Sequence, residues 1–165
     1  MMEPRGAIER ILLEWGNMLA AIPEIKVVSL ALYGSWARGN ARPDSDVDVL
    51  VVCDGLSVDR AERERLVIPS TREASRRLRA ALGPGAYPVL SPVLKTVAEA
   101  QYHAPLYLDM VHEARLLRDE GGFLRGVLDE VKANLERLGS RRVAFKGGWY
   151  WDLKPDYRPG EVFEI

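Results

Sequence analysis

Two carboxylates stand two residues apart in Asp46-Val47-Asp48, at the start of the apolar run DVDVLVVC. Because side chains alternate between the two faces of a β-strand, Asp46 and Asp48 would project from the same face of a strand here. Two neighbouring carboxylates repel each other and are costly to bury without a partner. A divalent cation removes that cost, and Mg²⁺ is typically held by one or two carboxylates together with substrate phosphates. The pair therefore predicts a Mg²⁺ site and, through the ion, a phosphate-bearing ligand.

A second group of residues suited to phosphate chemistry begins at Gly34-Ser35, where the apolar run KVVSLALY ends. Glycine lets the backbone approach a ligand closely, and the free amides at a helix N-terminus attract anions. The Ser35 hydroxyl can donate to a phosphate oxygen, and it can also cap the short helix that follows. Arg38 and Arg42 can neutralise further phosphate charge. Together with the aspartates, these residues predict a site for a nucleoside triphosphate.

The whole segment resembles the signature of the minimal nucleotidyltransferases, in the DNA polymerase β-like superfamily. The match rests on Gly34-Ser35-Trp36-Ala37-Arg38-Gly39 followed by Ser45-Asp46-Val47-Asp48, including the step of twelve residues from Gly34 to Asp46. The resemblance implies a nucleotidyltransferase fold of the α/β (α+β) class, with a small mixed sheet flanked by helices. It also implies that Asp46 and Asp48 are catalytic and bind Mg²⁺. The nucleotide-binding residues that it implies are Gly34, Ser35, Arg38, Arg42 and Ser45.

The resemblance implies a reaction as well. An enzyme of this family transfers a nucleotidyl group from a nucleoside triphosphate, here expected to be ATP, to an acceptor hydroxyl and releases pyrophosphate. Small stand-alone members resemble antitoxins that pair with helical HEPN-type proteins, so a HEPN-type partner is expected as well. The alternative function is a nucleotide-binding, antitoxin-type subunit that acts through contact with its partner, with weak or no turnover.

A third carboxylate, which the family normally adds from a later strand, is not evident. The corresponding strand, YPVLSPVL over residues 87–94, contains no acid. The remaining candidates are Asp44 in a turn, Asp109 in a predicted helix and Asp152 near the C-terminus. Without a third carboxylate, activation of the acceptor would be weakened more than nucleotide binding.

The elements that must position these residues follow from periodicity and turn residues. Helices are predicted over 3–20, 57–82, from 97, over 105–111 and over 123–138, with Pro69 splitting the second or starting its second half. Strands are predicted over 26–33, 46–53, 87–94, 114–118 and 142–145, and Pro88 and Pro92 make the third an edge or irregular strand. We expect a nucleotidyltransferase domain over residues 1–120. The C-terminal helix, strand and aromatic tail over 121–165 are expected to pack on the same domain.

The amino-acid composition of the chain limits the kinds of molecule that it is expected to bind. The chain has 165 residues, with 23 Lys and Arg against 24 Asp and Glu, so its charge does not indicate nucleic-acid binding or a polybasic membrane binder. Cys53 is the only cysteine and cannot form an internal disulfide. No apolar run reaches the roughly 20 residues of a membrane-spanning helix, and the first ten residues do not resemble a signal peptide. We therefore expect a cytoplasmic protein that does not bind membranes.

Two further groups have alternative interpretations. The aromatic residues of the tail can pack onto the core, or they can stack on a base or a partner; they are Trp149, Tyr150, Trp151 and Tyr157. His103 and His112 have no second histidine or cysteine at ligand spacing, which favours surface or capping roles over catalysis.

Overall fold

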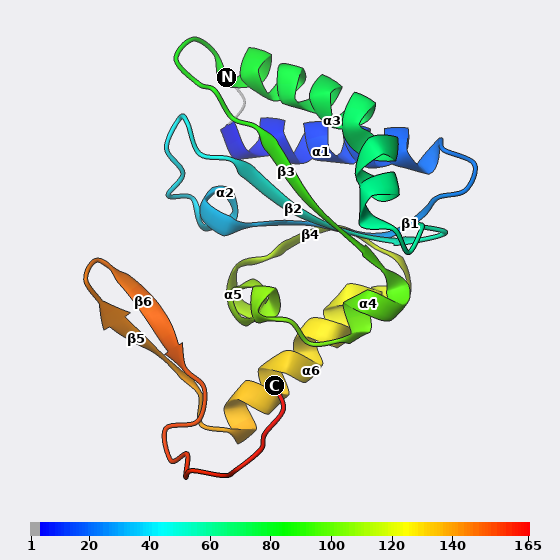
Figure 1. The fold of residues 1–165 in the computed structure, drawn as a ribbon. Helices are drawn as coiled ribbons and strands as arrows, with labels where there is room; N and C mark the ends of the chain where they lie inside the picture. The colour runs from blue at the N-terminus through cyan, green and yellow to red at the C-terminus, as the bar shows by residue number, and fades with distance from the viewer. Residues whose placement is uncertain (1–3) are drawn as a thin grey trace.

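A mixed sheet of four strands forms the centre of the molecule. The computed structural model describes residues 4–165, and Figure 1 shows the sheet between two groups of helices. The strands are β1 (Lys26–Tyr33), β2 (Val47–Asp54), β3 (Leu90–Thr96) and β4 (Arg115–Asp119), in the order β3-β2-β1-β4. β2 is antiparallel to β1 and parallel to β3, and β1 is antiparallel to β4. This arrangement confirms the predicted fold class.

The two central strands are apolar because both of their faces are covered. One face packs on α1 (Pro4–Ala20) and α3 (Arg60–Leu82), with the buried indole of Trp15 in this layer. The predicted start of α1 at residue 3 lies outside the described residues. Pro69 lies inside α3, which runs as one helix rather than two. The alternate residues Val47, Val49 and Val51 of β2 point into this layer and are fully buried.

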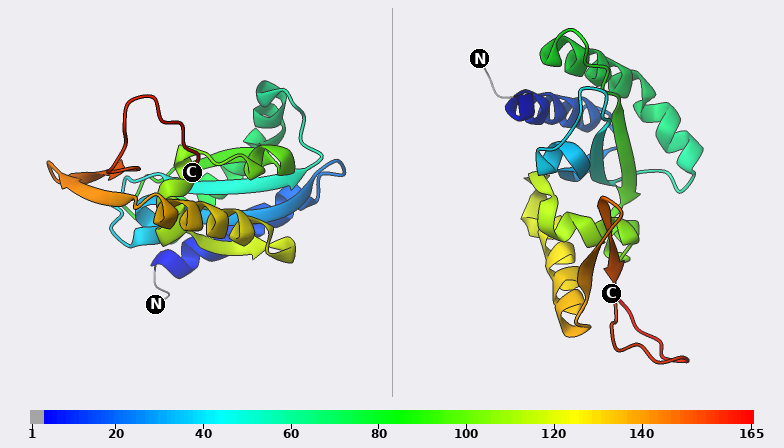
Figure 2. Two further views of the ribbon diagram at one scale, coloured as in Figure 1. Left: turned by 90° about the horizontal axis from the view of Figure 1, so that it is seen from below. Right: turned by 90° about the vertical axis from the view of Figure 1, so that its left-hand side faces the viewer.

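The other face is covered by the later helices, as the two views of Figure 2 also show. These are α4 (Val97–Gln101), α5 (Pro105–Glu113) and α6 (Phe123–Arg137), the last preceded by a 3₁₀ turn at Glu120–Gly122. Leu50 and Val52 of β2 pack in this second layer. A capping box begins α4, since Thr96 accepts from the Glu99 amide and Glu99 accepts from the Thr96 amide.

The segment after α6 differs from the prediction. Instead of a single last strand it forms an antiparallel hairpin of β5 (Arg141–Phe145) and β6 (Gly148–Asp152). Figure 1 shows the hairpin extending beside α5, away from the main sheet. Beyond the hairpin, the chain returns to α6, where Leu153 and Ile165 pack against the second layer. No helix among residues 4–165 combines the length and apolar character needed to cross a membrane.

Candidate active site

The aspartate pair lies at the start of β2. Asp46 immediately precedes the strand and is exposed, whereas Asp48 is its second residue and is half-buried. Because Val47 and Val49 point toward α1 and α3, the two aspartates share the opposite face of the strand. That face is the one covered by α5 and α6.

The surroundings of Asp48 favour a bound cation. Burial and then the neighbouring charge of Asp46 raise the pKa of Asp48, while the guanidinium of Arg38 acts in the opposite direction. Tyr33 lies directly opposite Asp48 in the β1–β2 pairing. Burial, with a smaller contribution from Asp48, raises the pKa of the Tyr33 hydroxyl to about 12, so this phenol stays neutral at physiological pH. A carboxylate whose ionised form is disfavoured in this way gains from a positive ligand.

Gly34 lies directly against Asp48, one member of the aspartate pair. It is the first residue of α2 (Gly34–Arg38) and has φ 73°, a conformation that side chains with a Cβ rarely adopt. A Cβ added at Gly34 would lie 2.5 Å from Asp48 Oδ2, closer than a real methyl group can approach. The absence of a side chain at residue 34 therefore makes room for the carboxylate of Asp48.

The two serines of the segment have different surroundings. Ser35 lies inside α2, whose N-cap is Tyr33 with no side-chain capping bond, so the capping role considered for Ser35 is not the one observed. The Ser45 hydroxyl accepts the backbone N–H of Arg42 at 2.9 Å, and its carbonyl accepts the indole N–H of Trp36 at 3.1 Å. Ser45 thus closes the loop between α2 and β2.

The two arginines are also placed differently. The side chain of Arg42 is 80% exposed at the rim of this loop and pairs with Asp44, with 3.3 Å between Nε and Oδ1. Arg38 instead points to α5, where its Nη1 lies 2.7 Å from Glu113 Oε2. Its guanidinium also lies 5.4 Å from the ring centre of Trp149. Sequence reasoning did not select Glu113, because nothing local links residues 75 positions apart.

Among the residues that the structure describes, no third carboxylate joins the pair. Ser91 of β3 is the residue that pairs with Asp48, and it carries a hydroxyl where an acid was sought. The three candidate acids have other partners: Asp44 pairs with Arg42, Asp152 with Arg141 and Asp109 with Arg142. Within residues 4–165, no three His, Cys, Asp or Glu side chains come together as a metal-binding group.

The donor set nevertheless fits Mg²⁺. This ion prefers oxygen ligands and commonly keeps several waters beside one or two carboxylates and substrate phosphates. Asp46 and Asp48 supply two such carboxylates, and no ion pair links either of them to a basic side chain in the described part of the chain. Because Gly34 has no side chain, its backbone lies directly against the Asp48 carboxylate. These residues would hold the ion together with groups from a bound triphosphate.

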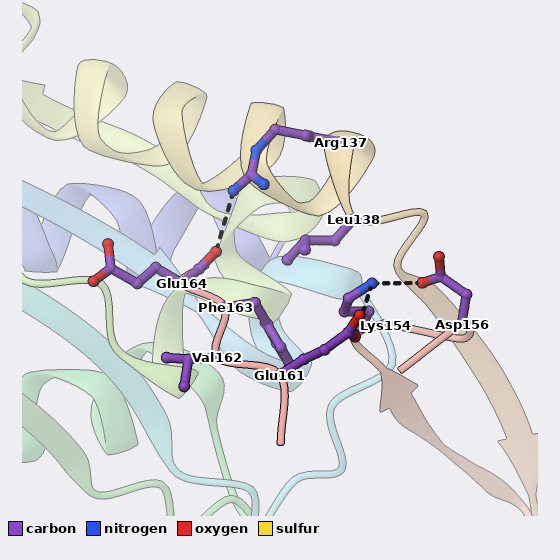
Figure 3. Close-up of a pocket in the computed structure, with 8 residues that line it drawn as sticks. All are labelled: Arg137, Leu138, Lys154, Asp156, Glu161, Val162, Phe163 and Glu164. Carbon is purple, nitrogen blue, oxygen red and sulfur yellow. Dashed lines mark hydrogen bonds and ion pairs between the residues drawn. The ribbon is translucent and has the colours of Figure 1, made fainter. Parts of the chain in front are cut away.

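A separate hollow lies at the other end of the chain. It has a volume of about 620 Å³, is open to solvent, and is lined by the end of α6 and the C-terminal tail (Figure 3). Three of its charged groups are paired with one another, since Lys154 Nζ lies 2.8 Å from Asp156 and 3.4 Å from Glu161, and Arg137 donates to the Glu164 carbonyl at 3.4 Å. These ion pairs tie the tail together, and none of the predicted site residues lines the hollow.

Comparison with known proteins supports the class of protein that this geometry indicates. Residues 17–83 match the family described as nucleotidyltransferase domain, which confirms the resemblance drawn from Gly34 to Asp48. The chain is also similar to a protein of Methanocaldococcus jannaschii named as a protein adenylyltransferase. The two are 26% identical over 115 residues, which make up 68% of this chain and 72% of the relative.

Solved structures with a similar backbone arrangement come from toxin–antitoxin complexes. One, determined with AMP-PNP, is 15% identical, with a TM-score of 0.43, and the likeness covers 79% of this chain and 92% of the other. Another is the tri-AMPylated HEPN toxin of Shewanella oneidensis in complex with MNT antitoxin. It is 14% identical with a TM-score of 0.42, over 82% of this chain and 92% of the other. At these TM-scores neither structure bears on the function of this chain.

Proposed function

We propose that this protein is a Mg²⁺-dependent nucleotidyltransferase that transfers the adenylyl group of ATP to a hydroxyl of a protein acceptor. The observation that carries the proposal is the contact between Gly34 and Asp48, which supports a phosphate-binding role for this turn beside a metal-binding role for the carboxylate. The nucleotidyltransferase match over residues 17–83 supports the reaction class. The name of the Methanocaldococcus jannaschii relative supports the choice of an adenylyl group and a protein acceptor.

The proposed roles follow from the position of each residue. Asp46 and Asp48 hold Mg²⁺, which when bound neutralises phosphate charge and activates the attacking hydroxyl. Gly34 lets the triphosphate approach the backbone, and the Ser35 hydroxyl donates to a phosphate oxygen. Arg38 and Arg42 bring positive charge from the end of α2 and from the middle of the loop that Ser45 closes.

The proposed reaction balances without a further reagent. The acceptor oxygen forms a bond to the α-phosphorus of ATP while the bond from that phosphorus to the bridging oxygen breaks. Pyrophosphate leaves with the electron pair, and the proton of the acceptor hydroxyl passes to water. Catalysis of this kind depends mainly on positioning and on neutralising charge, which is what the residues around Asp48 can supply.

The proposal extends to the organisation of the chain. We assign the nucleotidyltransferase domain to residues 1–120 and treat 121–165 as an extension that packs on it, in a cytoplasmic protein. The shared core layer supports the packing of this extension on the domain, because Leu128 and Leu135 of α6 lie in the same cluster as Leu50 of β2.

Transfer of label from ATP tests the proposal. The protein is incubated with Mg²⁺, a cell extract as the source of acceptors and each of the four α-³²P nucleoside triphosphates, beside Asp46→Asn/Asp48→Asn. We expect label from ATP on protein with the wild type and at least about a 100-fold loss with the double variant, because it removes both negatively charged ligands of the ion. Asp129→Asn, which removes an exposed carboxylate on α6, should transfer as the wild type does.

Other outcomes are decisive as well. Label on RNA or a small molecule, or label from another triphosphate, contradicts the proposed acceptor or donor. Binding of ATP without transfer supports the alternative of a nucleotide-binding subunit that acts through a partner. If ATP is neither bound nor transferred, the proposed site is wrong.

A further inference from the structure

The inner face of the hairpin carries a column of alternating cations and aromatic rings. In the β5–β6 pairing, Arg142 lies opposite Trp151 and Ala144 opposite Trp149, so these four residues share one face of the hairpin. The guanidinium of Arg142 lies 5.0 Å from the ring centre of Trp149 and 5.2 Å from that of Trp151. Trp151 in turn stacks on His112 of α5, with 5.9 Å between ring centres.

The column ends at the candidate active site. Its last member is Arg38 of α2, with 5.4 Å between the guanidinium and the ring centre of Trp149. Cation–aromatic contacts of this length are attractive and depend on the orientation of the two groups. Trp149 is thus the point at which the hairpin touches a residue of the segment between Gly34 and Asp48.

Two acidic residues of α5 hold the column in place. Glu113 accepts from Arg38 at 2.7 Å and from Arg142 at 2.9 Å, and its side chain is only 9% exposed. Asp109 accepts from Arg142 and from the indole N–H of both tryptophans, at 3.0–3.3 Å. Charge-assisted bonds to a largely buried carboxylate are among the stronger ones, so Arg38 is fixed from α5 and from the hairpin together.

The rest of the hairpin has little else to anchor it. Its outer face bears Phe145 and Tyr150, which are 58% and 53% exposed. An isolated two-stranded hairpin is marginally stable in water, so its position depends on the contacts of the inner face. The hairpin and the orientation of Arg38 are therefore coupled through Trp149.

We propose that Trp149 is a positioning residue for Arg38, so that the hairpin β5–β6 forms part of the nucleotide site. This inference rests on the proposed function, in which Arg38 meets the polyphosphate of ATP. The ring of Trp149 restricts the guanidinium to one plane, while Glu113 fixes the direction in which it points. Removing the ring leaves the charge of Arg38 in place but lets the group move, which weakens its contact with phosphate.

The test measures binding of ATP in the presence of Mg²⁺ by titration calorimetry, which requires no acceptor. We expect Trp149→Leu to raise the Kd about fivefold, as the loss of one cation–aromatic contact predicts, and Trp149→Tyr to restore most of the affinity. In an Arg38→Ala background, Trp149→Leu should change the Kd less than about twofold, because the effects of two substitutions are not additive when one residue acts through the other. Tyr150→Leu, on the outer face of the hairpin, should leave the Kd unchanged.

The outcomes separate this inference from the proposed function. If the wild type does not bind ATP, the proposed function fails and this inference with it. If the wild type binds and Trp149→Leu binds equally well, or if its effect is the same with and without Arg38, only the positioning role is overturned. Thermal unfolding of each variant distinguishes a local effect from a loss of fold, and the Trp149→Tyr variant keeps the test decisive if Trp149→Leu is unstable.

Discussion

At the scale of single residues, the candidate site depends on a side chain that is missing. Gly34 has a positive φ, and its α-carbon faces Asp48 with no room for a Cβ. In contrast, Gly126 in α6 has open space around it and an ordinary helical conformation. The two glycines therefore differ in what an added methyl group would meet.

Substitution of Gly34 by alanine should damage both stability and binding. We expect Gly34→Ala to lower the free energy of unfolding by about 1–2 kcal/mol, the cost of a left-handed conformation for a residue with a Cβ. The affinity for ATP with Mg²⁺ should also fall, because Asp48 has to move. Urea denaturation and calorimetry measure the two effects. Gly126→Ala should instead stabilise the protein by about 0.5–1 kcal/mol, and a Gly34→Ala variant as stable as the wild type would contradict the contact.

At the scale of elements, one ion pair joins α3 to the start of α4. Arg63 is only 3% exposed, and its two Nη atoms donate to Glu99 at 2.6 and 3.0 Å. The hydrogen bond from Arg63 is the largest cause that lowers the pKa of Glu99, to about 2. Because this is below the usual value of 4.5, the pair stabilises the fold fully above about pH 4.5 and loses that effect as the pH falls toward 2.

Replacement of Glu99 should therefore have a pH-dependent effect. Glu99→Gln leaves a buried guanidinium without its counterion, and since Glu99 itself is 37% exposed, we expect a loss of about 2 kcal/mol at pH 7. The difference from the wild type should shrink as the pH falls from 4.5 to 2, measured by urea denaturation at each pH. Glu73→Gln, at a surface pair with Arg77, should leave the free energy of unfolding almost unchanged. A constant difference across this pH range would rule out the pair as its source.

Local patterns predicted the elements whose formation depends on nearby residues. The strand Lys26–Tyr33 has the predicted bounds, Pro92 lies in an edge strand, and Thr96 caps α4 as its spacing to Glu99 indicates. The second strand of the hairpin was missed although its signal is local, since Lys146 and Gly147 form the two-residue turn with positive φ that joins β5 to β6. The position of the hairpin beside α5, in contrast, depends on contacts such as Trp149 with Asp109, which lie 40 residues apart. The same reason explains why the sequence indicated Arg38 but not its partner Glu113.

At the scale of the whole molecule, resistance to local unfolding differs between the main sheet and the hairpin. The central strands β1 and β2 are covered on both faces, and residues such as Leu30 and Leu50 are fully buried. In the hairpin, most residues of β5 and β6 are exposed, and its docking relies on side chains of the inner face. Segments with few buried apolar contacts open locally at low cost.

Hydrogen exchange should report this difference directly. We expect backbone amides of β5 and β6 to exchange at least about 100-fold faster than those of β1 and β2, because local opening of the hairpin leaves both core layers intact. Mass spectrometry of peptides covering 26–33, 47–54 and 141–152 measures the rates. Equal protection in the three peptides would contradict the separation of the hairpin from the main core.

The outer edge of β3 limits the association of copies of the protein through their sheets. Leu90 donates its N–H to the Ser75 hydroxyl of α3 at 3.1 Å, so the row of amides that points away from β2 includes Leu90 and the alternate residues after it. The next residue in that row is Pro92, which has no N–H to offer. With one donor occupied and the next absent, this edge is a poor template for a strand from another molecule. Sheet-to-sheet polymerisation through β3 is thereby discouraged.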